Sequence, residues 1–256
     1  MGIFDGYLII SDFDGTFATK TEPVEKNLPA VRYFTENGGR FTVATGRTVD
    51  FIREKNLGDL INAPACLYNG SVVYDYGKEA FLRVRHLPFS VEEMLTIMDD
   101  QLHYLQKIDV YRDCESIIHQ YIPDLSREWL ESKPLKILCR FETPEEADAF
   151  KAAASLRFDT ERCHLSKSFA LGVEFNPPDG TKGHALEYIK SILPGVHTAI
   201  AVGDNDNDRV LLSHADIAAA PANATPSVKE LADIHLCPCT EGAIADLIRQ
   251  LENKHK

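Results

Sequence analysis

Two aspartates one residue apart follow an apolar run near the start of the chain, in the segment YLIISDFDGTF (Tyr7 to Phe17). On an extended backbone, this spacing directs the side chains of Asp12 and Asp14 to the same side. Burying two unpaired carboxylates next to each other is costly. The pair is therefore either an acidic turn or a pair of carboxylates held for chemistry, and the rest of the sequence decides between them.

A second acidic segment, VGDNDND, also follows an apolar run, and it places Asp204, Asp206 and Asp208 within one turn. The helix dipole is a sufficient reason for Asp206 alone. If both segments meet at one edge of a sheet, two like charges about 4 Å apart repel by roughly 4 kcal/mol at an effective dielectric constant of about 20, so a cation is needed between them. Oxygen ligands favour a hard ion, Mg²⁺ rather than zinc.

A calcium loop and a glycosyltransferase site fit the acidic segments less well. A calcium loop of the EF-hand type needs Gly and Glu where this chain has Arg209 and Ala215, so it is excluded. The DFD segment could be the metal-binding pair of a glycosyltransferase, but that would leave VGDNDND without a role.

Two further segments offer groups that suit a phosphate. VATGR ends another apolar run, where Thr45 supplies a hydroxyl and Gly46 an exposed backbone N–H. DGTKGHAL places Lys182 at the start of a predicted helix. Arg47 could bind the substrate, but we favour a structural ion pair, because arginine is preferred in buried pairs. Each segment is a weak signal alone, but all four lie at strand-to-helix junctions and together indicate one site.

The elements that position these residues follow a regular alternation. YLII, FTVAT and HTAIAVG are nearly continuous apolar runs, typical of parallel strands covered on both faces, and a helical pattern lies next to each. The alternation predicts an α/β fold with a doubly wound, mostly parallel, Rossmann-like sheet. Ligands bind at the carboxyl ends of the strands in such sheets, which is where Asp12 and Asp204 are expected.

The middle of the chain follows a different pattern. In LKILCRF and KIDVY apolar residues alternate with polar ones, which is typical of half-buried antiparallel strands. Next to these strands, Ser90 with Glu93 and Thr143 with Glu146 form capping boxes that begin helices. We therefore expect the α/β core in residues 1–81 and 177–256, and an inserted α+β cap domain in residues 82–176.

The composition excludes several classes of function. The chain has 256 residues, 44% of them hydrophobic, and a formal net charge of -12, which disfavours a nucleic-acid partner. No apolar run approaches the roughly 18 residues of a membrane span, and the N-terminal segment lacks the features of a signal peptide. We expect a cytoplasmic protein with no nucleic-acid or membrane partner, while its oligomeric state is not predictable from the sequence.

Taken together, the motifs resemble those of the haloacid dehalogenase (HAD) superfamily of phosphatases. DFDGT is similar to its first motif, VATGR to its second, Lys182 to its third and GDNDND to its fourth. YNGSVVYD, PANATPSVKELAD and TEGAIADLI are similar to segments of the Cof-type branch, mostly sugar-phosphate phosphatases, and the inserted unit lies where the superfamily has its larger cap. The resemblance implies a Mg²⁺-dependent phosphatase acting on a small phosphorylated metabolite, with a sugar phosphate as the expected class.

The resemblance also implies a role for each candidate residue. Asp12 is expected to attack phosphorus and form an aspartyl-phosphate, while Asp14 gives a proton to the leaving alcohol and then accepts one from water. The expected ligands of Mg²⁺ are Asp12, Asp204 and the backbone carbonyl of Asp14, and Asp208 is expected either to bind the ion directly or to contact its ligands. The expected phosphate-binding residues are Thr45, Gly46, Lys182 and Asn207.

Two other functions stay open from the sequence. A phosphomutase or phosphotransferase on the same core would pass the phosphate to a second acceptor instead of water. A non-catalytic, metal-binding regulatory protein is also compatible, because fold alone does not determine function. The sequence identifies neither the substrate nor the cap residues that select it.

Overall fold

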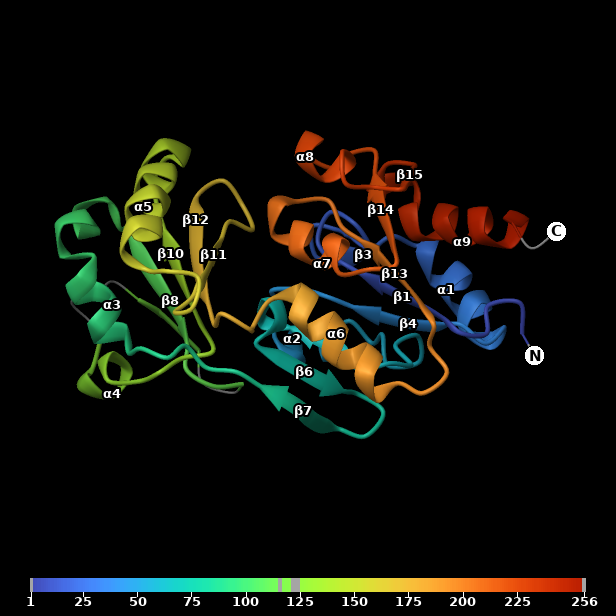
Figure 1. Cartoon of the computed structure of the whole chain (residues 1–256), viewed down its shortest axis with the longest axis horizontal. Helices are drawn as coiled ribbons and strands as arrows, with labels where there is room; N and C mark the ends of the chain where they lie inside the picture. Colours follow the sequence, from blue (N-terminus) through green and yellow to red (C-terminus); the bar gives the residue numbers. More distant parts are fainter. Residues whose placement is uncertain (1, 115–116, 121–124, 255–256) are drawn as a thin grey trace. The chain divides into compact units, whose positions relative to one another are not determined.

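The computed structural model of the protein describes residues 2–114, 117–120 and 125–254 (Figure 1). The chain divides into two compact units: a core unit, Met1–Arg83 with Lys182–Lys256, and an inserted unit, Val84–Thr181. The junctions expected from the sequence, 81/82 and 176/177, lie a few residues before the observed ones, which follow Arg83 and Thr181. That the inserted unit acts as a cap stays a prediction.

A five-stranded parallel sheet forms the centre of the core unit, in the strand order β15-β14-β13-β1-β4. From β1 the chain passes to β4 on one side, and it later returns to β13 on the other side. The strand order therefore reverses at β1, and ligands bind beside such a point in open α/β sheets. The strands are β1 (Tyr7–Ser11), β4 (Arg40–Val43), β13 (Thr198–Val202), β14 (Ile217–Pro221) and β15 (Ile234–Leu236).

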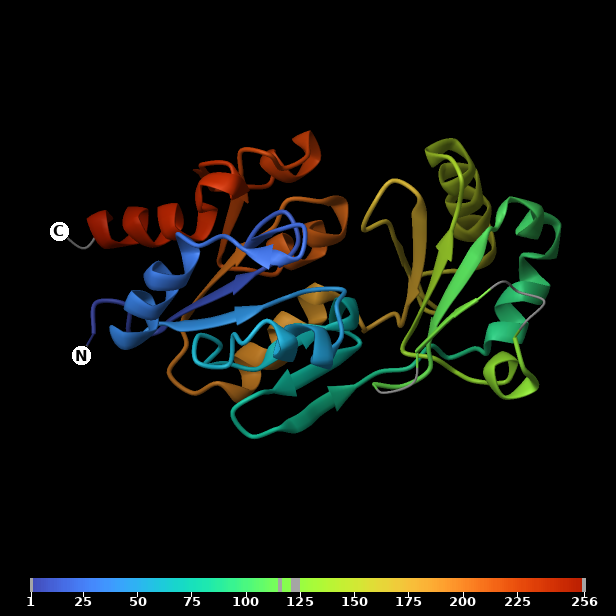
Figure 2. The same cartoon turned by 180° about the vertical axis from the view of Figure 1, so that it is seen from behind.

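Helices cover both faces of this sheet, which accounts for its nearly continuous apolar strands. On one face, α1 and α9 pack against each other and against β4 and β15, as Figures 1 and 2 show from opposite sides. On the other face, apolar residues of α6, α7 and α8 join those of β1, β13 and β14 in one buried cluster. The helices of the core unit are α1 (Asn27–Glu36), α2 (Val49–Glu54), α6 (Lys182–Ile192), α7 (Arg209–Ser213), α8 (Pro226–Lys229) and α9 (Ala243–Lys254).

Smaller β elements complete the core unit. An isolated parallel bridge between Ala44 and Cys66 places strand β5 beside the end of β4. Strand β5 belongs to a three-stranded sheet in the order β5-β6-β7, and β2 and β3 form a short hairpin after the DFDGT segment. These strands are β2 (Ala18–Thr19), β3 (Glu22–Pro23), β5 (Ala65–Leu67), β6 (Val72–Asp75) and β7 (Ala80–Val84).

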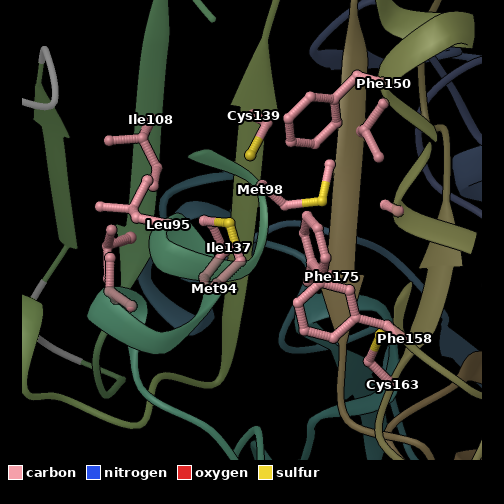
Figure 3. Close-up of a cluster of buried hydrophobic side chains, with 14 of the residues drawn as sticks. Met94, Leu95, Met98, Ile108, Ile137, Cys139, Phe150, Phe158, Cys163 and Phe175 are labelled. Carbon is pink, nitrogen blue, oxygen red and sulfur yellow. The ribbon is translucent and has the colours of Figure 1, made fainter. Parts of the chain in front are cut away.

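The inserted unit has its own five-stranded antiparallel sheet, in the order β11-β12-β10-β8-β9. Alternate residues of β10, Ile137 and Cys139, join an apolar cluster with Met94 of α3 and Phe150 of α5, which Figure 3 shows. The alternating pattern in the sequence thus marks one face of this sheet. The elements are α3 (Val91–Ile97), β8 (Lys107–Tyr111), β9 (Ile117–Gln120), α4 (Arg127–Leu130), β10 (Lys136–Arg140), α5 (Pro144–Arg157), β11 (His164–Ser166) and β12 (Gly172–Asn176).

The predicted fold class is confirmed: a doubly wound, mostly parallel α/β core carries an α+β insertion. Of the two capping boxes expected in the insertion, the one at Thr143 and Glu146 is complete, whereas the one at Ser90 and Glu93 has only the hydrogen bond to the Ser90 hydroxyl. The hydroxyl of Thr143 accepts a hydrogen bond from the N–H of Glu146, and the Glu146 carboxylate accepts one from the N–H of Thr143, each at 3.2 Å. At the start of α3, the hydroxyl of Ser90 accepts a hydrogen bond from the N–H of Glu93 at 3.1 Å. None of the described helices combines the length and apolar character that crossing a bilayer requires.

We predict that Phe175→Ala strongly destabilises the inserted unit. The ring of Phe175 is fully buried and packs against Phe150 and Phe158, and truncating such a side chain costs about 3–5 kcal/mol. Denaturant unfolding followed by circular dichroism measures the free energy of unfolding. Leu156→Ala is the control, because Leu156 is 90% exposed on α5 and its loss should cost less than about 0.5 kcal/mol. Equal losses in the two variants would contradict the assignment of this core.

Candidate active site

The carboxyl ends of β1 and β13 bring the two acidic segments together. Ser11 and Val202 are partners in the parallel register, and the N–H of Asp12 donates to the carbonyl of Val202 at 2.8 Å. Asp12 and Asp204 therefore leave the sheet at neighbouring positions. Together with Asp208, they offer carboxylate oxygens that all lie within 4.8 Å of one another.

The turn after Asp12 makes this close approach possible. Gly15 has a φ of +86°, and a Cβ atom at this position would lie 2.5 Å from Oδ2 of Asp204. The hydroxyl of Thr16 donates to Oδ1 of Asp204 at 3.0 Å. The Gly-Thr pair of the first segment thus has a physical purpose, because it lets the first turn contact the second acidic segment.

Lys182, the first residue of α6, links the two acidic segments. Its Nζ donates to Oδ1 of Asp12 and to Oδ1 of Asp208, each at 2.6 Å, and all three side chains are almost completely buried. The other oxygen of Asp208, Oδ2, accepts hydrogen bonds from the backbone N–H groups of Asp204 at 3.0 Å and Asn205 at 3.1 Å. Asp208 is therefore held through both of its oxygens.

The charges of this cluster do not cancel, because it contains three carboxylates and one ammonium group, that of Lys182, which contacts Asp12 and Asp208. Burial, and then the charge of Asp208, raises the pKa of Asp12 well above its ordinary value, and Lys182 opposes this only in part. Burial and the charge of Asp208 also raise the pKa of Asp204, to about 6. Burial acts to lower the pKa of Lys182, but Asp12 and Asp208 together raise it above its ordinary value.

The cluster fits a divalent cation. If its carboxylates are ionised, two negative charges remain after Lys182 is counted, and a divalent ion would neutralise them. The donor atoms are carboxylate oxygens, which suit a hard ion such as Mg²⁺. Asp12 and Asp204 are the better direct ligands, because Asp208 already accepts hydrogen bonds at both oxygens.

Asp14 pairs with a different cation. Nε of Arg47 donates to Oδ2 of Asp14 at 2.9 Å, and Nη2 donates to Oδ1 at 2.8 Å. The structure thus places Arg47 in an ion pair, as the sequence suggested, but its partner is a candidate site residue. Arg47 therefore belongs to the site. The sequence could have indicated this, because Arg47 lies two residues after Thr45, a candidate phosphate-binding residue.

The candidate phosphate-binding residues lie at the same edge of the sheet. Thr45 and Gly46 follow β4, the neighbour of β1, and the hydroxyl of Thr45 accepts a hydrogen bond from the N–H of Arg47 at 3.2 Å. Asn207 lies beyond β13, in the 3-10 helix Asp206–Asp208. These residues and Lys182 therefore come from three separate elements of the core unit.

Two positions that brace the site were not assigned a role from the sequence. Nδ2 of Asn223 donates to the carbonyl of Gly15 at 2.8 Å, and its Oδ1 accepts a hydrogen bond from the N–H of Cys239 at 2.7 Å. Asn69 was expected in a turn that could also lie beside the site. It has a φ of 61°, and its N–H donates to the carbonyl of Thr45 at 2.9 Å. In the sequence, each of these residues is recognisable only as an asparagine in a loop close to the end of a predicted strand.

Comparison with known proteins identifies the family. Residues 9–248 match the haloacid dehalogenase-like hydrolase family, so the chain belongs to it. The resemblance inferred from the motifs is confirmed, and so is the prediction that the protein is a hydrolase.

Three similar proteins illustrate the range of the family. Phosphoglycolate phosphatase of Methanopyrus kandleri is 25% identical over 250 residues, which cover 95% of this chain and 96% of that protein. Pyridoxal phosphate phosphatase YbhA of Escherichia coli is 23% identical over 270 residues, which cover 94% of this chain and 97% of that protein. A solved sugar phosphatase of HAD subclass IIB has the same fold, with a TM-score of 0.77 and 19% identity over 96% of this chain and 99% of that one.

We predict that Asp204→Asn stabilises the metal-free protein at neutral pH. The pKa of Asp204 in the folded state, about 6, lies above that of an unfolded aspartate, so the folded state binds the proton more tightly. The contribution of Asp204 to the free energy of unfolding is fully present below about pH 4 and is lost as the pH rises through about 6. Removing the charge should therefore gain roughly 1–3 kcal/mol near pH 7 and little near pH 4.

Urea unfolding in the presence of a chelator, at several pH values in this interval, measures the effect. Asp206→Asn is the matched control, because Asp206 is exposed and lies outside the buried cluster. A loss of stability in Asp204→Asn at neutral pH would contradict the predicted repulsion.

Proposed function

We propose that the protein is a Mg²⁺-dependent phosphatase that hydrolyses a small phosphorylated metabolite through an aspartyl-phosphate on Asp12. The observation that carries this proposal is the convergence of Asp12, Asp204 and Asp208 beside buried Lys182. A phosphate ester is an anion, so a carboxylate can approach it only where positive charge offsets the repulsion. In a chain of net charge -12, that positive charge must be local.

The names of the relatives support a small phosphorylated substrate. Two are phosphatases of phosphoglycolate and of pyridoxal phosphate, and a protein of the same fold is a sugar phosphatase. Within this range we favour a sugar phosphate, because YNGSVVYD, PANATPSVKELAD and TEGAIADLI are similar to the Cof-type branch. The inserted unit would then select the leaving group as a cap.

The metal would be held by Asp12, Asp204 and the backbone carbonyl of Asp14. Asp208 would contribute its charge while it positions Lys182 and the turn at Asp204, because its two oxygens already accept hydrogen bonds from these groups. When bound, Mg²⁺ supplies positive charge that stabilises the phosphate oxygens during transfer.

The chain's own residues would carry the proton and phosphoryl transfers. A carboxylate oxygen of Asp12 attacks phosphorus, and the ester P–O bond breaks as Asp14 gives its proton to the leaving oxygen. Asp14 then accepts a proton from water, whose oxygen attacks phosphorus, so that inorganic phosphate leaves and Asp12 is restored. The phosphate-binding groups would be the hydroxyl of Thr45, the N–H of Gly46, Lys182 and Asn207.

We predict that Asp12→Asn abolishes phosphate release from a panel of sugar phosphates, nucleotides and cofactor phosphates. Removing a nucleophile typically costs roughly 10⁴-fold or more in kcat. Asp206→Asn is the control and should keep its activity, because its side chain is exposed. Turnover that survives in Asp12→Asn would contradict the mechanism. An isomerised sugar phosphate without free phosphate would indicate a phosphomutase instead.

We predict that removing divalent metal with a chelator abolishes turnover and that added Mg²⁺ restores it. Mg²⁺ should also raise the melting temperature of the wild-type protein near pH 7, because it relieves the repulsion among the buried carboxylates. This rise should be much smaller in Asp204→Asn, which loses one ligand, and unchanged in Asp206→Asn. Full activity in chelator, or equal Mg²⁺ stabilisation of both variants, would rule out the proposed metal site.

A further inference from the structure

The ion pair between Arg47 and Asp14 has a defined two-point geometry, although an ion pair this exposed adds little to the stability of the fold. The guanidinium contacts both carboxylate oxygens, at 2.8 and 2.9 Å. The side chains are nevertheless 40% and 36% exposed. Pairs this exposed typically contribute about 0–1 kcal/mol, because water screens them and the side chains lose freedom. A two-point contact does, however, fix the direction of a carboxylate.

Arg47 is itself held from several sides. Its guanidinium carbon lies 4.5 Å from the centre of the Phe51 ring, and that ring packs edge-on against Phe13 with a centroid distance of 5.8 Å. Phe13 is fully buried and directly precedes Asp14 in the chain. These contacts connect Phe13 to Phe51, Phe51 to Arg47 and Arg47 to Asp14, which is bonded to Phe13 in the chain, so they form a closed circuit.

The backbone of Arg47 is fixed as well. Its N–H donates to the hydroxyl of Thr45 at 3.2 Å, and its carbonyl accepts a hydrogen bond from the N–H of Tyr68 at 3.1 Å. The guanidinium thus projects from an anchored loop, so it can hold Asp14 in one direction at a small further loss of conformational freedom. Asp12, which directly precedes Phe13, is instead held by Lys182.

On the basis of the proposed function, we propose that Arg47 is a positioning residue. It holds the ionised Asp14 carboxylate beside the site through both oxygens, and when Asp14 takes up the proton that it later donates, the protonated oxygen leaves the guanidinium and faces the leaving-group oxygen while the other oxygen stays bound to Arg47. Lys182 and Arg47 would then separate the tasks of the two aspartates, since each basic residue orients one of them. Misplacing a proton donor by about 1 Å can cost roughly 100-fold in rate. The effect should appear only where the leaving oxygen needs a proton, and not where it departs readily as a stable anion.

The test compares a series of alkyl and aryl phosphates whose alcohols span a wide range of acidity, with kcat and KM measured separately. In Arg47→Met, kcat should fall roughly 10- to 100-fold for alkyl esters and by less than about threefold for nitrophenyl esters. Arg47→Lys, which keeps the charge but loses the two-point contact, should recover only part of the alkyl rate. Arg53→Met is the matched control, because Arg53 pairs with Asp50 in α2 outside the site and should react like the wild type.

Asp14→Asn separates failure of this inference from failure of the proposed function. Asp14→Asn should show the same dependence on the leaving group, and adding Arg47→Met to it should cause little further loss of kcat. If Asp14→Asn has this dependence but Arg47→Met reduces all esters equally, changes only KM or changes nothing, the positioning role is wrong. If Asp14→Asn itself lacks the dependence, or the wild type turns over no ester, the proposed function is wrong. Melting curves of each variant confirm that it is folded.

Discussion

The contact on which the site depends is the one between the buried ammonium of Lys182 and the carboxylates of Asp12 and Asp208. The three residues come from three segments far apart in the chain, so this contact joins the ends of β1, β13 and α6. One ammonium group does not neutralise the carboxylates around it. The raised pKa values of Asp12 and Asp204 express this excess of negative charge, and a divalent cation is the simplest way to relieve it.

The topology of the sheet makes the contact possible. Because β1 lies between β4 and β13, the residues after these three strands meet at one edge, where the order of the sheet reverses. Gly15 then allows the first turn to approach Asp204 more closely than any residue with a side chain would. The family to which the chain belongs is one of hydrolases, and a site of clustered carboxylates held by a buried lysine is consistent with it.

The sequence predicted the parts of this site that depend on backbone periodicity. Continuous apolar runs identified β1, β4 and β13, and residues directly after a strand end have little freedom in where they lie, so Asp12 and Asp204 could be placed together. The partner of Arg47 and the bracing role of Asn223 could not be predicted. Both depend on the side-chain directions of loop residues, which no periodic pattern records. The inserted sheet was recognisable from its alternating residues, but not the position of its side chains relative to a substrate.

The most direct test of the account is to trap the phosphorylated residue. The protein is mixed with Mg²⁺ and a substrate, quenched during turnover and treated with borohydride, which reduces an aspartyl-phosphate to homoserine. Peptide mass spectrometry then locates the reduced residue. The account predicts homoserine at position 12, and only when Mg²⁺ and substrate are both present. Reduction at another residue, or rapid turnover with no reduced residue at all, would contradict it.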